Sequence, residues 1–147
     1  MITSRRLRLV DRERVLSRID ELDGYLKELD IIMPTDFRAY KVIEKKRSCE
    51  RLLQIAIEAI INICALMVTG LRLGIPSEED DIFDKLEQSK IITPAMKETL
   101  KRMKGFRNIL VHEYGHIDDD LVYGILKNNI KDFRAFKKEI LDALKRV

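Results

Sequence analysis

Apolar residues recur along much of the chain at alternating steps of three and four, the spacing that gathers side chains on one face of an α-helix. The pattern predicts a first helix from about Arg6 to Asp30, with one buried stripe and charged remaining faces. It predicts a second from about Phe37 to Leu71, charged at first and apolar at nearly every position from Leu52 onward. That change places the second half of this helix at the centre of the molecule.

Capping signals predict the remaining helices. A serine followed by acids predicts a short helix from about Glu78 to Ser89. The next helix is predicted to begin at Thr93-Pro94, because proline is favoured at the first helical position. Asp118 or Asp119 caps a last helix, which keeps its apolar spacing until Lys145. Four substantial helices with short connections predict an all-α, up-and-down four-helix bundle with one additional short helix.

Length and composition agree with a single helical domain. The chain has 147 residues, 36% of them charged and 6% aromatic, so we expect one domain over residues 1–147. The net charge is only +3, so any nucleic-acid site must come from local clustering. Cys49 and Cys64 lie too far apart along one predicted helix to pair, which predicts reduced thiols.

The most apolar stretch, Leu52 to Val68, is interrupted by three polar residues. We interpret it as a buried core helix rather than a membrane span. No secretory segment is visible before it, because charges recur from the start of the chain. These observations predict a soluble, cytoplasmic protein with no membrane partner.

The segment from Arg107 to Tyr114 has the spacing R-x4-H-x-Y. Arg107 stays charged, His112 can gain or lose a proton near neutral pH, and Tyr114 adds a phenol, a set suited to phosphate chemistry. Arg107 also falls on the apolar stripe of its helix, so it needs a partner or a cleft.

The directions of these side chains raise a geometric problem. Asn108 and His112, four apart, share a helix face, whereas Arg107 and His112 lie about 140° apart around the axis. Either the helix loosens near His112, or a second copy of the chain completes the site as a symmetric dimer.

Lys97, Lys101 and Lys104 follow the helix face that continues into Asn108 and His112. An extended phosphate backbone could be guided along this face, which makes the three lysines candidate RNA-binding residues. Lysines on the solvent side of an amphipathic helix give the same pattern, and both interpretations stay open.

With RNA as substrate, the ribose 2′-hydroxyl can attack the adjacent phosphorus without a metal or another cofactor. His112 would then act as general base or acid, and Arg107 would stabilise the charge that develops on the phosphoryl oxygens. Asn108 would orient the substrate or the imidazole. In a purely structural alternative, Arg107 pairs with an acid and His112 is a helix-end residue favoured by the dipole.

The segment His112 to His116 also satisfies the zinc-protease pattern H-E-x-x-H. That pattern requires both histidines on one continuous helix and a third ligand. The second histidine follows Gly115 and precedes an aspartate-rich cap, so the helix is predicted to end between them. We therefore expect no metal site.

The block from Met103 to Asp118 resembles the signature of the HEPN superfamily and is most similar to its HepT branch. The similarity extends back through the Ile91–Pro94 helix start and the Leu73–Pro76 break to the apolar helix from about Glu50, roughly the last two thirds of the chain. It implies an endoribonuclease toxin whose helical bundle forms a homodimer, with two R-x4-H motifs lining a cleft. It also implies a separate MNT-type nucleotidyltransferase antitoxin as partner.

Residue by residue, the resemblance implies that Arg107 and His112 are catalytic and that Asn108 is a supporting polar residue. It implies that the antitoxin transfers AMP to Tyr114. A nucleotide there would add bulk and negative charge two residues from His112, where the substrate phosphate must sit. The alternative is a non-catalytic helical protein that docks a nucleotidyltransferase and binds nucleotide.

Overall fold

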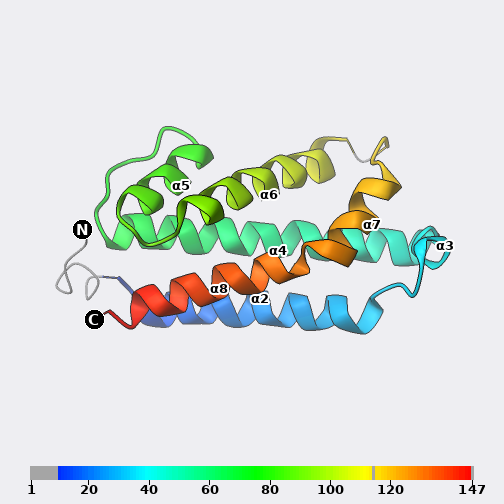
Figure 1. Ribbon diagram of the computed structural model, residues 1–147, viewed down its shortest axis with the longest axis horizontal. Helices are drawn as coiled ribbons and strands as arrows, with labels where there is room; N and C mark the ends of the chain where they lie inside the picture. Colours follow the sequence, from blue (N-terminus) through cyan, green and yellow to red (C-terminus); the bar gives the residue numbers. More distant parts are fainter. Residues whose placement is uncertain (1–9, 114, 147) are drawn as a thin grey trace.

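The computed structural model describes residues 10–113 and 115–146, and this part of the chain is helical, with no strand. The all-α prediction is confirmed. The described helices, drawn in Figure 1, are α2 (Arg12–Ile32), α3 (Phe37–Tyr40), α4 (Ile43–Gly70), α5 (Glu79–Gln88), α6 (Pro94–His112), α7 (Asp119–Asn128) and α8 (Ile130–Leu144).

Helix α4 forms the centre of the molecule. In Figure 1 it runs between α2 and α8 on one side and α5 and α6 on the other, and α2 makes its most extensive contacts with it. α4 is long and apolar enough to cross a membrane by length and composition, and 56% of its apolar window is buried inside the protein. Burial of this kind is what the apolar run from Leu52 predicted for a core helix.

Two predicted helices are each divided in the structure. The expected helix from Phe37 to Leu71 breaks at Val42, whose backbone is extended (φ −62°, ψ 125°), and this separates α3 from α4. The expected last helix breaks at Asn129, where α7 ends and α8 begins. The Asn129 side chain donates to Asp132 Oδ2 (3.1 Å) in the first turn of α8, a local bond that favours a helix start.

The first helix also begins later than predicted among the described residues. α2 starts at Arg12, and the Asp11 carboxylate accepts a hydrogen bond from the Arg14 amide (3.1 Å) as an N-cap. The predicted residues 6–9 of this helix lie outside the described part of the chain.

Cys49 and Cys64 are free and buried on α4, which confirms the prediction of unpaired thiols. Burial raises the pKa of both thiols. Neither sulfur is therefore placed to act as a nucleophile.

Candidate functional site

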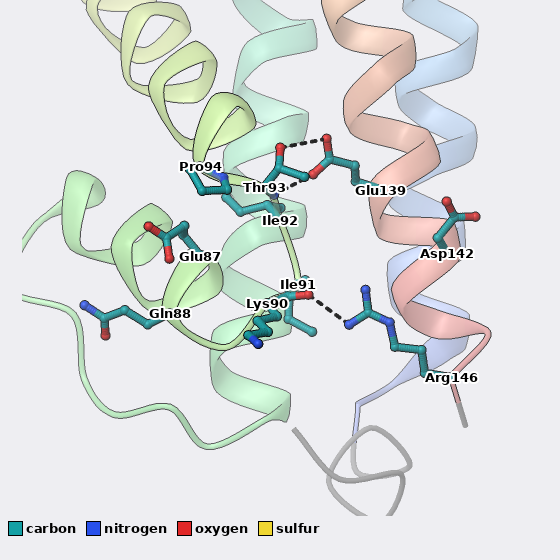
Figure 2. A pocket seen from close by; sticks show the side chains of 10 residues that line it. All are labelled: Glu87, Gln88, Lys90, Ile91, Ile92, Thr93, Pro94, Glu139, Asp142 and Arg146. Atoms are coloured by element: carbon teal, nitrogen blue, oxygen red, sulfur yellow. Dashed lines mark hydrogen bonds between the residues drawn. The ribbon is translucent and has the colours of Figure 1, made fainter. Parts of the chain in front are cut away.

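The start of α6 is fixed as the sequence predicted. Pro94 is its first residue, and the Thr93 hydroxyl accepts a hydrogen bond from the Met96 amide (3.1 Å). Glu139 of α8 accepts hydrogen bonds from the Thr93 amide (2.8 Å) and hydroxyl (3.3 Å), as Figure 2 shows. These contacts tie the beginning of the motif helix to α8.

A pocket of about 500 Å³ lies beside this helix start (Figure 2). It is lined by the end of α5, the connection to α6 and the end of α8, and Arg146 donates a hydrogen bond to the Lys90 carbonyl (2.9 Å) across it. None of the predicted site residues lines this pocket.

The predicted site residues lie at the other end of α6. Phe106 and Leu110 bury one face of the helix, Arg107 and Asn108 are partly buried beside that face, and His112 is exposed at the last helical position. α6 remains helical through His112, so the helix does not loosen between the arginine and the histidine. The first of the two expected solutions, a loosened helix, is therefore wrong, and completion of the site by a second copy of the chain stays a prediction.

Arg107 has the partner that its position required. Its Nη2 is paired with Oε1 of Glu79, the first residue of α5, and its Nε donates to the Oδ1 of the neighbouring Asn108 (2.9 Å). The Arg107 side chain is only 14% exposed, against 38% for Glu79. Asn108 thus contacts the arginine, and the ion-pair partner expected by the structural alternative is present.

The three candidate lysines continue this pairing along α6. Lys104 pairs with Asp80 (2.6 Å), Lys101 with Asp84 (3.0 Å) and Lys97 with Glu87 (3.2 Å), all from α5. Together with Glu79 and Arg107 they form what we call the α5–α6 ion-pair row. The hydrogen bond to Asp84 raises the pKa of Lys101. RNA binding by these lysines remains a prediction, and it would require the phosphates to replace carboxylates.

Sequence reasoning missed that four acids of α5 pair with these cations. They were interpreted as the charged first turn and surface of a connecting helix. A signal did exist, because Asp80, Asp84 and Glu87 follow one another at steps of four and three, as Lys97, Lys101 and Lys104 do. Steps of three and four gather each set of charges on one face of its helix, so the two antiparallel helices can present facing rows of opposite charge.

His112 is exposed, and its side chain makes no hydrogen bond or ion pair with the residues that the structure describes. Tyr114 lies outside the described residues, so its predicted role stays a prediction. His116 follows the end of α6, and its amide donates to the Glu113 carbonyl (2.8 Å) in a turn. The prediction that the helix ends between the two histidines is confirmed, and H-E-x-x-H does not have its helical context here.

A second pocket, of about 470 Å³, opens beyond the end of α6. It includes Arg47, Glu50 and Arg51 of α4 and Gly115 after the motif. Glu50 is 8% exposed and accepts a hydrogen bond from Arg47 Nη1 (2.8 Å), a pair at i, i+3 spacing that sequence reasoning did not assign to the site. Positive charge therefore lies near the motif on α4 as well as on α6.

The fold is shared with solved structures of other proteins. A Bacillus subtilis protein, YutE, described as cytosolic and of unknown function, superimposes with a TM-score of 0.80 at 25% identity, over 93% of this chain and 92% of that one. The tri-AMPylated Shewanella oneidensis HEPN toxin, solved in complex with an MNT antitoxin, also gives 0.80 at 29% identity, over 87% and 96%. The class defined by this fold is that of HEPN-type helical proteins.

Sequence relatives narrow the class. The mRNA nuclease HepT of Shewanella oneidensis is 37% identical over 84 residues, and the match covers 57% of this chain and 63% of the relative, less than two thirds of its length. The tRNA nuclease HepT of Aphanizomenon flos-aquae is 28% identical over 128 residues, covering 87% of this chain and 86% of the relative. A family model described as "Ribonuclease HepT-like" matches residues 19–140. This chain belongs to the HepT-like ribonuclease family, as its motif predicted.

Proposed function

We propose that this protein is a metal-independent endoribonuclease toxin of an HEPN/MNT toxin–antitoxin pair. The observation that carries the proposal is the intact R-x4-H pair at the end of α6, in which Arg107 is paired with Glu79 and His112 is exposed. Family membership and relatives named mRNA nuclease and tRNA nuclease support an RNA substrate.

In the proposed reaction the ribose 2′-hydroxyl attacks the adjacent phosphorus, and the 5′-oxygen leaves. His112 transfers protons as general base and acid, and Arg107 stabilises the extra charge on the non-bridging oxygens. One strand then ends in a 2′,3′-cyclic phosphate and the other in a 5′-hydroxyl. No metal takes part in these steps.

A homodimer would complete the site. Because one continuous helix directs Arg107 and His112 about 140° apart, a single α6 cannot aim both at one phosphorus. A two-fold axis near the helix end would place the motifs of two subunits on opposite sides of one groove. Each subunit, a single domain built as an up-and-down bundle, would contribute both residues.

The proposed regulator is a nucleotidyltransferase that modifies Tyr114 with AMP. Support comes from the solved complex of an AMPylated HEPN toxin with an MNT antitoxin. The description of YutE as cytosolic supports a cytoplasmic location. Mass spectrometry of this protein co-expressed with such a transferase should find AMP on Tyr114 and lose it in Tyr114→Phe.

The central test is cleavage of end-labelled RNA by purified protein, with and without a chelator. We expect His112→Ala and Arg107→Ala each to lower the rate at least about 100-fold. His116→Ala, four residues on and also exposed, is the matched control and should leave the rate unchanged. Full cleavage by His112→Ala refutes the proposed mechanism, and loss of wild-type cleavage in chelator refutes its independence from metal.

The α5–α6 ion-pair row favours a second candidate function. Because Lys97, Lys101, Lys104 and Arg107 are all paired with α5 carboxylates, this face offers little free positive charge to RNA. A non-catalytic partner that docks a nucleotidyltransferase and binds nucleotide would need none. Growth arrest on expression that disappears in His112→Ala supports the nuclease, whereas equal growth of both strains supports the docking role.

A further inference from the structure

We propose that Glu79, at the start of α5, is a positioning residue that sets the plane of the Arg107 guanidinium. The inference rests on the proposed nuclease function, which it extends to a residue outside the R-x4-H motif. Its basis is the contact of Glu79 Oε1 with Arg107 Nη2, together with the contact of Asn108 with Arg107 Nε.

The two contacts hold the guanidinium at separate nitrogens. Asn108 accepts from Nε (2.9 Å) and Glu79 accepts from Nη2, so two of the five N–H donors are used. Among the described residues no partner is found for Nη1. A planar group held at two nitrogens keeps one orientation and can present its remaining donors to a phosphate oxygen.

Burial makes the arginine depend on this glutamate. The Arg107 side chain is 14% exposed, and the acid that balances it is 38% exposed. Removing Glu79 would leave a largely buried guanidinium without a counter-charge, which is strongly unfavourable. The side chain would then turn toward solvent and lose the direction that catalysis requires.

Glu79 is itself delivered by a fixed helix. Ile82, Phe83 and Leu86 bury the apolar face of α5 against the core, and this burial outweighs the partly exposed ion pairs of the row. At the helix start, the Asp81 carboxylate accepts a hydrogen bond from the Ser77 amide (3.0 Å). α5 is therefore fixed on the core and is not a mobile lid, so the Glu79–Arg107 ion pair is formed before substrate binds.

The other pairs of the row set the register of α5 along α6. Asp80, Asp84 and Glu87 meet lysines in reverse order, and a slip of one turn would separate each pair. Only the Glu79 pair involves a residue of the R-x4-H motif. This asymmetry allows the positioning role to be tested against pairs of the same chemistry on the same helix.

The test compares kcat and KM for RNA cleavage in wild type, Glu79→Ala, Glu79→Gln and the control Asp84→Ala. We expect Glu79→Ala to lower kcat about 100-fold, as a misplaced catalytic group does, with a smaller change in KM. Glu79→Gln keeps an acceptor for Nη2 and should lose less. Asp84→Ala breaks a neighbouring pair and should leave kcat unchanged. A kcat for Glu79→Ala equal to or above that of wild type overturns the proposal.

A second measurement is independent of catalysis. The ¹⁵N-labelled protein should show a protected Nε–H signal for Arg107, assigned by its loss in Arg107→Lys. We expect Glu79→Ala to raise the exchange rate of this proton at least about 10-fold, and Asp84→Ala to leave it unchanged. Unchanged protection in Glu79→Ala overturns the proposal even if the wild type cuts no RNA. If the wild type cuts no RNA but Glu79→Ala loses the protection of the Arg107 Nε–H proton, Glu79 still positions Arg107 and only the proposed nuclease function fails.

Discussion

Substitution of Tyr40 by phenylalanine should stabilise this protein, although it removes a polar group from the core. Tyr40 ends α3, is fully buried, and packs its ring against Tyr123 of α7 (centroids 6.0 Å apart). Its hydroxyl oxygen is buried without a hydrogen-bond partner among the described residues. An unsatisfied buried hydroxyl costs about 1–3 kcal/mol, so Tyr40→Phe should raise the free energy of unfolding by about 1 kcal/mol at neutral pH.

The gain should grow at high pH. Burial, followed by the negative charges of Glu50 and Asp119, raises the pKa of Tyr40 above its ordinary value of 10.0. Below that value both the folded and unfolded states hold the proton, and the hydroxyl adds no pH dependence. Above it the unfolded chain loses the proton first, so the wild type loses about 1.4 kcal/mol per pH unit until the folded pKa is reached. Phenylalanine has no such proton to lose.

Urea unfolding of wild type and Tyr40→Phe, near pH 7 and about one unit above the ordinary tyrosine pKa, measures both effects. Tyr123→Phe, at a partly exposed tyrosine in contact with Tyr40, is the matched control and should change stability less. A loss of stability in Tyr40→Phe at neutral pH would show that the hydroxyl is satisfied, for instance by a bound water. A pH-independent difference would show that it ionises as readily in the folded state.

Three further outcomes follow from packing. Phe83→Ala should lower the free energy of unfolding by about 3–5 kcal/mol, and Lys104→Gln by less than about 1 kcal/mol, as chemical denaturation would measure. The reason is that apolar burial, rather than the ion pairs, holds α5 on the core. Gly70→Ala should lower the melting temperature despite the better helix propensity of alanine, because the new Cβ would lie 2.9 Å from the Val10 Cα. Cys64, whose thiol pKa is raised by burial, should resist iodoacetamide near pH 8 until the protein is unfolded, as intact-mass spectrometry would show.

Local signals explain which parts of the fold could be predicted. Thr93-Pro94 and Asp118 act through neighbouring residues alone, and both helices start where these caps indicated. The breaks at Val42 and Asn129 were missed because the apolar spacing continues across them. Tyr40, just before the first break, and Ile130, just after the second, are both buried. Periodicity reports which face is buried, and it does not report a change in helix direction.

The motif could be found from sequence, but its electrostatic setting could not. Arg107 was expected to need a partner, and nothing in its own helix identified Glu79, which is 28 positions away. The sequence shows that Lys97, Lys101 and Lys104 are charged. Whether they can bind a phosphate depends on α5, whose acids pair with all three. Ion pairs between helices arise from tertiary packing, and only the steps of three and four shared by the acids and the lysines indicated them.

The basic residues of α6 therefore serve two roles, ion pairing with α5 and, in the proposed reaction, contact with a phosphate. These side chains hold α5 in register, while the proposed reaction needs one of them, Arg107, to face a phosphate. The geometry reconciles these roles, because Glu79 and Asn108 occupy Nη2 and Nε and leave Nη1 without a described partner. If the three lysines stay paired, attraction of RNA would have to come from other basic residues, such as Arg51 beside the second pocket or those of a second subunit. In the proposed reaction the row would then hold one cation, Arg107, in place, and binding of an RNA chain would depend on surfaces outside α6.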